Sequence, residues 1–329
     1  MKKKIAVFFL VVFLIAIFLF CGCARTKENY DAFIGIAWSA DSKYYEQIAR
    51  TLDVMSIKYV VLDQVKTELV PYDGIQVSSA GINEQGYLLE KYADDVKKNI
   101  FEKSNVVSVI KNIDGVIFPG GFDISPSLYK KPKPWHGIDE EISYDAATDV
   151  SDYILMNYCI QNDIPVFGIC RGMQVLGVCC GVTITQDIPT QLKNEGIQYD
   201  YTHREFSDRL DSNRDFASHD VLVIDKDSVL YDIAGDTILK NVPSWHHQSI
   251  ANVDGTNLKV TGVTNTCGHD IIEAIQYIGK KYITGIQFHP EVAVVKNIDK
   301  EENASNYMSK KQAEKFFSYF YDEVKTLKD

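Results

Sequence analysis

The sequence predicts a three-layer α/β fold, with helices on both faces of a doubly wound, mostly parallel sheet. Three observations support this prediction. Short apolar, β-branched runs alternate along the chain with segments of helical periodicity, which is the pattern of βαβ units. The 329 residues are 46% apolar and 24% charged, as expected for a globular protein. Glycine-rich turns follow two of the apolar runs, and in such folds catalytic groups lie at the carboxyl ends of the strands.

A leader precedes the globular part of the chain. Residues 2–4 are lysines, residues 5–20 form an uninterrupted apolar run, and Gly22-Cys23 follows. A positive region, an apolar run and a small residue directly before a cysteine resemble a bacterial lipoprotein signal. The leader is therefore excluded from the fold prediction.

The expected domain organisation follows from this leader. Residues 1–22 would be removed as a lipoprotein-type signal peptide, a lipid on Cys23 would anchor the chain to the cell membrane, residues 23–32 would form a tether, and residues 33–329 the globular domain. The alternative is an uncleaved N-terminal transmembrane anchor, although the apolar run is shorter than the roughly 20 residues that span a bilayer. Both alternatives place the globular domain outside the cytoplasm.

Charge and cysteine usage exclude several classes of partner. A formal net charge of −11 argues against nucleic acid, which requires a basic face. Five cysteines lie in the predicted domain: Cys159, Cys170, Cys179, Cys180 and Cys267. Their spacing fits neither a disulfide framework nor a paired C-x-x-C zinc site. The sequence therefore predicts no metal and no organic cofactor, leaves one thiol available for chemistry, and indicates no oligomeric state.

Apolar runs mark the strands of the first half of the domain. Strands are predicted over residues 33–38, 58–62, 114–118 and 164–169, and helices over residues 44–55, 145–162 and 171–180. The strands are mostly apolar, as expected when both faces are buried, and the helices repeat apolar residues every three to four positions. A weaker helical pattern covers residues 86–101 inside the long stretch 64–112, which we expect to form a lid or a partner surface.

The second half of the domain continues the same pattern. Strands are predicted over residues 182–185, 221–224, 258–263, 271–277 and 282–288, and a last helix over residues 309–324. Because strands and helices still alternate, these strands are expected to join the same sheet.

The segment Gly168-Ile-Cys170-Arg-Gly172 carries the strongest chemical signal. It lies where a predicted strand turns into a predicted helix, which is the cysteine version of the G-x-S-x-G nucleophile elbow. Glycine is needed on both sides because side chains there would collide with neighbouring backbone. The N-terminus of the helix favours the thiolate of Cys170. A buried cysteine in a tight turn is the structural alternative.

A second segment supplies a base for this thiol. His289-Pro-Glu291 follows the apolar run 282–288, at the carboxyl end of another predicted strand. A thiol needs a base to take its proton, and an imidazole needs a partner that fixes its tautomer. Glu291 can accept a hydrogen bond from one ring nitrogen of His289 while the other nitrogen faces Cys170.

An acyl-transfer site also needs hydrogen-bond donors for the oxyanion that develops. The Gly120-Gly121 turn follows the strand predicted over residues 114–118 and can expose a backbone N–H. The backbone amide of Arg171 supplies a second donor.

These segments resemble, in order and approximate spacing, the class I glutamine amidotransferase domain. More narrowly, the chain resembles the gamma-glutamyl-gamma-aminobutyrate hydrolase branch, which is the peptidase C26 group. The matching segments are residues 118–126, 145–149, 172–174, 181–189, 244–248, 272–276 and 285–291. The resemblance covers residues 111–325 well and residues 33–62 loosely. It implies a flavodoxin-like three-layer sheet with a nucleophile elbow.

The resemblance also implies roles for the site residues. Cys170 would be the nucleophile, His289 the base and Glu291 the orienting acid. The backbone amides of Gly121 and Arg171 would form the oxyanion hole. The candidates for the substrate pocket are Gly120, Asp123, Gln174, His246, His247 and Gln248. For the last three, a turn that packs through its tryptophan is the structural alternative.

The activity implied by the resemblance is hydrolysis of a gamma-glutamyl amide bond in a small substrate through a cysteine thioester, with release of glutamate. One alternative is a glutaminase-type amidotransferase subunit that passes ammonia to a synthase. Another is a non-catalytic, membrane-tethered binding protein on the same fold. The leader and the long stretch 64–112 depart from the family, so the amine side of the substrate stays open.

Overall fold

The computed structural model describes residues 31–131, 135, 137–200, 202–204 and 216–328. The predicted signal peptide and Cys23 lie outside these residues, so the lipoprotein prediction is not tested by the structure. The fold occupies residues 32–329, which form one of two units along the chain. Within the described ranges, no helix is both long and apolar enough to span a membrane.

A nine-stranded sheet forms the middle layer, in the order β2-β1-β5-β6-β13-β12-β11-β8-β9. Five neighbouring strands are parallel: β2 (Tyr59–Val61), β1 (Ile34–Ile36), β5 (Gly115–Phe118), β6 (Val166–Ile169) and β13 (Ile283–Ile286). The other strands pair antiparallel: β12 (His269–Tyr277), β11 (Leu258–Thr266), β8 (Ala217–Val223) and β9 (Ile238–Ser244). Because only β12 and β8 run against the rest of this sheet, the prediction of a mostly parallel sheet is confirmed.

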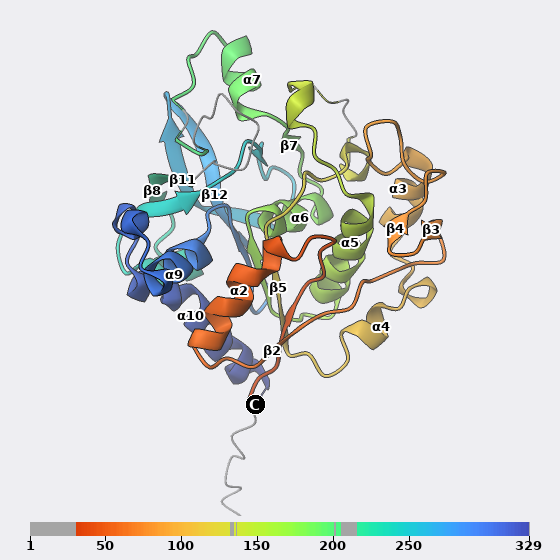
Figure 1. The fold of residues 1–329 in the computed structure, drawn as a ribbon, viewed down its shortest axis with the longest axis horizontal. Helices are drawn as coiled ribbons and strands as arrows, with labels where there is room; N and C mark the ends of the chain where they lie inside the picture. The colour runs from red at the N-terminus through yellow and green to blue at the C-terminus, as the bar shows by residue number, and fades with distance from the viewer. Residues whose placement is uncertain (1–30, 132–134, 136, 201, 205–215, 329) are drawn as a thin grey trace, which may run out of the picture. The chain divides into compact units, whose positions relative to one another are not determined.

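Helices cover both faces of the sheet (Figure 1). On one face lie α3 (Glu90–Lys97), α4 (Val106–Val109), α5 (Ala146–Gln161) and α6 (Arg171–Cys179). On the other face lie α2 (Lys43–Val54), α8 (Val229–Ala234), α9 (Pro290–Asp299) and α10 (Lys310–Lys328). Val116 and Phe118 of β5 pack into the first apolar core, and Ile117 between them packs into the second. This alternation is that of a strand buried on both faces, and the three-layer α/β prediction is confirmed.

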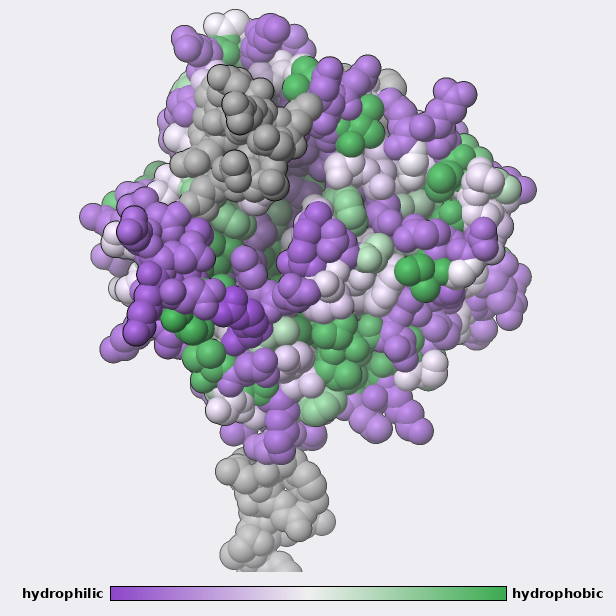
Figure 2. All heavy atoms as spheres, viewed as in Figure 1, coloured by the Kyte–Doolittle hydropathy of each residue, from purple (hydrophilic) through white to green (hydrophobic). Residues whose placement is uncertain are grey.

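The outer surface is polar where the two cores are apolar. Figure 2 shows hydrophilic side chains over most of the face viewed in Figure 1, with apolar side chains gathered in a few patches. The two apolar cores are the main source of stability, since burial of apolar surface is the dominant favourable contribution to folding.

The strand predicted over residues 182–185 does not join the main sheet. Only Ile184–Thr185 (β7) is extended, and it pairs with Ser249–Ile250 (β10) in a separate two-stranded ribbon. Directly afterwards Asp187 caps α7 (Ile188–Asn194) by accepting a hydrogen bond from a backbone N–H of its first turn. The prediction that this run joins the main sheet is therefore wrong, because its extended residues pair with β10 instead.

Several elements were not predicted, β9, α7, α8 and α9 among them, and one helix is shorter than predicted. The start of α9 does carry sequence signals, because Pro290 is its first residue and Glu291 lies in its first turn. The helix predicted over residues 86–101 is α3 over Glu90–Lys97 alone, and a 3-10 turn follows at Phe101–Lys103.

Candidate active site

Cys170 lies in the sharp turn between β6 and α6, with φ 51° and ψ −106°. This backbone conformation is rare for residues with a side chain. A Cβ atom on Gly168 would lie 2.7 Å from the carbonyl carbon of Gly172, and one on Gly172 would collide with the backbone of Phe118. The two glycines therefore allow β6, α6 and β5 to approach closely enough to hold the turn.

The sulfur of Cys170 is surrounded by polar groups although the residue is 7% exposed. The side-chain amide of Gln287 donates a hydrogen bond to Sγ at 3.4 Å, and the backbone carbonyl of Trp245 lies 3.9 Å from Sγ. Gln287 was not predicted as a site residue. It lies directly after β13 and two positions before His289, within the run predicted as a strand, where alternate residues share a face, so this spacing could have indicated it.

His289 and Glu291 form a tight pair next to this sulfur. Nδ1 of His289 lies 2.7 Å from Oε1 of Glu291. Burial alone would lower the pKa of His289, but the carboxylate of Glu291 and the sulfur of Cys170 outweigh it and raise the pKa to about 10. His289 is therefore an imidazolium at neutral pH. The ring of Phe216 covers His289 edge-on, with the ring centroids 5.2 Å apart.

The glycine turn after β5 closes the site from the other side. A Cβ atom on Gly120 would lie 3.0 Å from Cε1 of His289, and one on Gly121 would lie 2.9 Å from Cδ of Arg171. Among the described residues, the backbone amides of Gly121 and Arg171 donate to no protein acceptor, so both remain available to a ligand. The structure thus brings together the nucleophile, base, acid and oxyanion-hole residues named from the sequence.

The side chain of Arg171 has a separate role that sequence reasoning missed. It is 2% exposed, and its guanidinium pairs with Asp149 at 2.6 Å and with Asp152. Asp149 also accepts hydrogen bonds from the backbone N–H and hydroxyl of Ser125. This buried ion triad ties the start of α6 to α5 and to the loop that follows Gly121.

Gln174 connects the elbow to the segment 244–248. Its side-chain amide donates to the backbone carbonyl of Gln248 at 3.3 Å and to Oε1 of Gln287 at 3.2 Å. Through Gln287 this chain of amides reaches Sγ of Cys170. Gln174 therefore positions other groups, and it was proposed from the sequence only as a pocket residue.

His247 is held between two carboxylates. Nε2 lies 3.1 Å from Oδ1 of Asp123, and Nδ1 lies 3.1 Å from Oδ1 of Asp187. Burial would lower the pKa of His247, but Asp123 and Asp187 raise it to about 9. His247 is therefore a cation at neutral pH, and it joins the loop after Gly121 to the cap of α7.

Several buried polar atoms around His247 have no hydrogen-bond partner among the described residues. They are Oδ2 of Asp123, the hydroxyl of Tyr144, Nε1 of Trp135, and the side-chain amide atoms of Gln186 and Gln248. Buried polar groups in proteins are almost always paired. A cluster of unpaired ones beside a candidate nucleophile marks the place where the polar groups of a ligand can bind.

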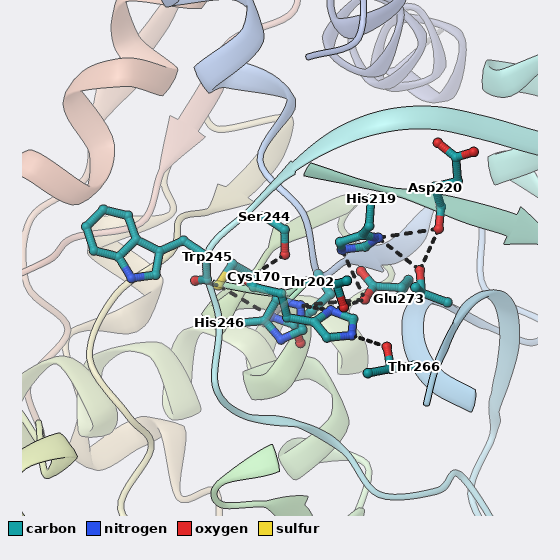
Figure 3. Close-up of polar contacts among 12 residues, drawn as sticks. Cys170, Thr202, His219, Asp220, Ser244, Trp245, His246, Thr266 and Glu273 are labelled. Atoms are coloured by element: carbon teal, nitrogen blue, oxygen red, sulfur yellow. Dashed lines mark hydrogen bonds and ion pairs between the residues drawn. The ribbon is translucent and has the colours of Figure 1, made fainter. Parts of the chain in front are cut away.

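His246 turns away from this region. Its Nδ1 hydrogen-bonds the carbonyl of Gln248 at 2.8 Å, and its Nε2 faces His203 and Glu273. Figure 3 shows the ring of His246 directed toward Glu273 rather than toward Cys170. The neighbouring histidines of the predicted pocket segment therefore point to different surroundings.

The fold and this site define a class of protein, the class I glutamine amidotransferase-like superfamily. Residues 97–291 match the Peptidase C26 family, and the chain belongs to this family. It is thus a glutamine amidotransferase-like hydrolase of amide bonds.

Curated relatives agree with this assignment. Protein NtpR of Enterococcus hirae is 30% identical over 184 residues, which cover 56% of this chain and 69% of that protein. A putative glutamine amidotransferase of Mycobacterium tuberculosis is 29% identical over 190 residues, or 58% of this chain and 54% of that protein. The gamma-glutamyl-gamma-aminobutyrate hydrolase PuuD of Escherichia coli is 26% identical over 195 residues, or 58% of this chain and 68% of that protein.

Solved structures with some likeness include PurLQS from Thermotoga maritima, at 13% identity and a TM-score of 0.49, covering 89% of this chain and 98% of that chain. The glutaminase domain of CTPS from Trypanosoma brucei has 15% identity and a TM-score of 0.48, covering 91% of this chain and 95% of that chain.

Removal of the Glu291 charge should lower the pKa of His289. We expect the Cε1 signal of His289, followed by NMR of labelled histidine, to titrate near pH 10 in the native protein and lower in Glu291→Gln. The raised pKa of His289 stabilises the folded protein fully below the ordinary value of 6.5, and this stabilisation is lost as the pH rises through about 10. The free energy of unfolding of Glu291→Gln should therefore fall below that of the native protein mainly at neutral and lower pH. The exposed His269 is the control, and an unchanged His289 titration would contradict the expectation.

Removal of one carboxylate from the buried ion triad should strongly destabilise the fold. Asp152→Asn leaves the buried guanidinium of Arg171 with one carboxylate, and we expect unfolding in urea to show a loss of about 3 kcal/mol. The matched control is Asp299→Asn, which breaks the exposed pair with Arg50 and should cost far less, because water screens an exposed ion pair. Equal losses in the two variants would refute this account of the triad.

Proposed function

We propose that the protein hydrolyses gamma-glutamyl amide bonds through a thioester on Cys170. The observation that carries the proposal is the alignment of Cys170, His289 and Glu291 beside two backbone amides that donate to no acceptor in the described part of the chain. The name of the Escherichia coli relative, a gamma-glutamyl-gamma-aminobutyrate hydrolase, supports a gamma-glutamyl substrate.

The reaction runs in two halves. The thiolate of Cys170 attacks the gamma-carbonyl carbon, and the amides of Gly121 and Arg171 donate hydrogen bonds to the oxyanion that forms. As the C–N bond breaks, the imidazolium of His289 gives its proton to the departing amine. A water then attacks the thioester while His289 accepts a proton, the C–S bond breaks, and glutamate leaves with the thiolate restored.

Glu291 and Gln287 keep these groups in position. Glu291 accepts the Nδ1 proton of His289, which directs Nε2 toward the sulfur and stabilises the imidazolium. The amide of Gln287 donates to Sγ and so fixes the position of the sulfur.

The gamma-glutamyl head would bind near His247. Its ammonium group needs an acceptor. Oδ2 of Asp123, on the loop directly after the glycine turn, is an acidic oxygen without a partner among the described residues. Its carboxylate needs donors or a positive charge, which the side-chain amide of Gln248 and the imidazolium of His247 offer. These groups support a small, zwitterionic substrate head, while the amine that leaves is selected elsewhere.

A diazoketone analogue of glutamine should alkylate Cys170 and not the other cysteines. We expect peptide mass spectrometry of the full-length protein to find the adduct on Cys170, and Cys170→Ala to remain unlabelled. The exposed Cys267 is an internal control for non-specific alkylation. Absence of the adduct from Cys170 under conditions that modify Cys267 would overturn the catalytic proposal.

The substrate is tested with gamma-glutamyl-GABA, gamma-glutamyl dipeptides, poly-gamma-glutamate and glutamine. We expect glutamate release from at least one gamma-glutamyl amide, reduced at least about a thousandfold in Cys170→Ala. Asp123→Asn should raise KM more than it lowers kcat, because Asp123 binds the head and not the scissile bond. If only glutamine reacts, and only with an added partner, the protein is a glutaminase-type amidotransferase subunit.

We also propose that the protein is an extracytoplasmic lipoprotein anchored through Cys23, because Gly22-Cys23 ends the apolar run. Metabolic labelling with an alkyne fatty acid should modify the full-length chain in a bacterial host and fail in Cys23→Ala. Cys21→Ala is the matched control and should keep the label. Labelling that persists in Cys23→Ala, or a chain that keeps its full mass, would indicate an uncleaved anchor.

A further inference from the structure

Four buried side chains converge on one point next to the candidate active site. They are His203 after α7, His219 on β8, His246 after β9 and Glu273 on β12. All four are less than 9% exposed, and their ligand atoms lie within 4.8 Å of one another. Figure 3 shows the rings of His219 and His246 and the carboxylate of Glu273 directed toward a common centre. The proposed hydrolysis does not use this cluster.

The outer hydrogen bonds assign the tautomers of two of these rings. Nδ1 of His246 lies 2.8 Å from the carbonyl oxygen of Gln248, which can only accept, so this nitrogen carries the proton. Nδ1 of His219 lies 3.0 Å from the hydroxyl oxygen of Thr264. That hydroxyl donates to the carbonyl of Asp220 at 2.8 Å and therefore accepts from His219. In the neutral rings, both Nε2 atoms present lone pairs to the centre.

The atoms that face the centre of the cluster are therefore mostly hydrogen-bond acceptors, with few donors among them. Nε2 of His219 and both carboxylate oxygens of Glu273 have no well-directed hydrogen bond within the described part of the chain. Oε1 of Glu273 lies 3.2 Å from Nδ1 of His203, 3.5 Å from Nε2 of His246 and 3.6 Å from Nε2 of His219. The third ring, His203, directs Nε2 to the hydroxyl of Thr266 at 2.6 Å. Its Nδ1 can therefore donate at most one hydrogen bond to these acceptors.

Water cannot stabilise this arrangement, because all four side chains are buried. A buried anion that faces lone pairs is costly unless a cation lies between them.

We propose that His203, His219, His246 and Glu273 form a structural Zn²⁺ site. Zinc bonds of about 2.0–2.2 Å in a tetrahedron put neighbouring ligand atoms about 3.3–3.6 Å apart. The three distances from Oε1 of Glu273 to the rings lie in or close to this range, as does the 3.2 Å between Nδ1 of His203 and Nε2 of His246. Three imidazoles and one carboxylate supply four protein ligands. A coordination shell filled by the protein, with no position open to water, is typical of structural zinc sites.

The outer acceptors complete the pattern of a metal site. Histidine ligands almost always donate their second ring nitrogen to a carbonyl, carboxylate or water, which fixes the tautomer. The carbonyl of Gln248 accepts from His246. The hydroxyl of Thr264 contacts the second nitrogen of His219, and that of Thr266 contacts the second nitrogen of His203. The sequence predicted no metal because these ligands lie far apart along the chain, on separate strands and loops.

The metal would hold one wall of the candidate pocket. His246 directly follows Trp245, whose carbonyl lies 3.9 Å from Sγ of Cys170, and directly precedes His247. Zinc bound to His246 would link this segment to β8 and β12. The site is therefore a positioning device and not part of the bond-breaking chemistry.

The test is metal content of the untagged, full-length protein. The protein is dialysed against excess zinc, freed of loose metal on a chelating resin, and measured by inductively coupled plasma mass spectrometry. We expect close to one zinc ion per chain, and the visible d–d bands of tetrahedral Co²⁺ after cobalt exchange. Chelation should lower the thermal unfolding midpoint. A native protein that retains no stoichiometric zinc has a hydrogen-bonded histidine network instead, and the proposal is then wrong.

Variants locate the site. His219→Gln and Glu273→Gln should each reduce retained zinc at least about tenfold and abolish the cobalt bands. His269→Gln removes an exposed histidine outside the cluster and should retain the metal fully. Retention of zinc and cobalt bands in both cluster variants would overturn the assignment. The measurement on the native protein does not depend on whether the variants fold.

Discussion

The close approach of three backbone segments around Cys170 is the constraint on which the site depends. The turn from β6 into α6 holds Cys170 at φ 51°, and only glycine at positions 168 and 172 lets the neighbouring backbone come near enough. The backbone N–H of Cys170 also donates to the carbonyl of Ile286 at 2.7 Å, which ties the turn to β13. Because β13 leads directly into His289, the position of the base follows from the position of the nucleophile.

Buried ion pairs then fix the loops around this turn. Arg171 joins α6 to α5, His247 joins the loop after the glycine turn to α7, and Glu291 orients His289. Buried charges are expensive unless they are paired, so each loop has one favourable arrangement and few alternatives. The histidine and glutamate cluster follows the same rule, with zinc proposed as the missing positive charge.

The sequence predicted the parallel half of the sheet and the central residues of the site. Apolar runs before Gly120, before Cys170 and before His289 end as strands in neighbouring positions, because parallel strands bring their carboxyl ends to one edge. The antiparallel half was harder to predict. Residues 182–185 have the composition of a strand, but their extended residues pair with β10 in a separate ribbon. The strand β9 exposes the apolar Ile238 as well as the polar Lys240 and Asn241, so its alternation is weak.

What the sequence determined by itself is local: the two glycines around Cys170, the His289-Pro-Glu291 spacing, and the alternation of strands and helices. Each of these features depends on residues within one turn or one strand, so the order of residues along the chain is sufficient to predict it. The tertiary structure alone decided which distant charges meet. The partners of Arg171 and His247, and the convergence of three histidines on Glu273, come from segments far apart in the chain. No local spacing encodes such pairings, because the sheet order brings these segments together.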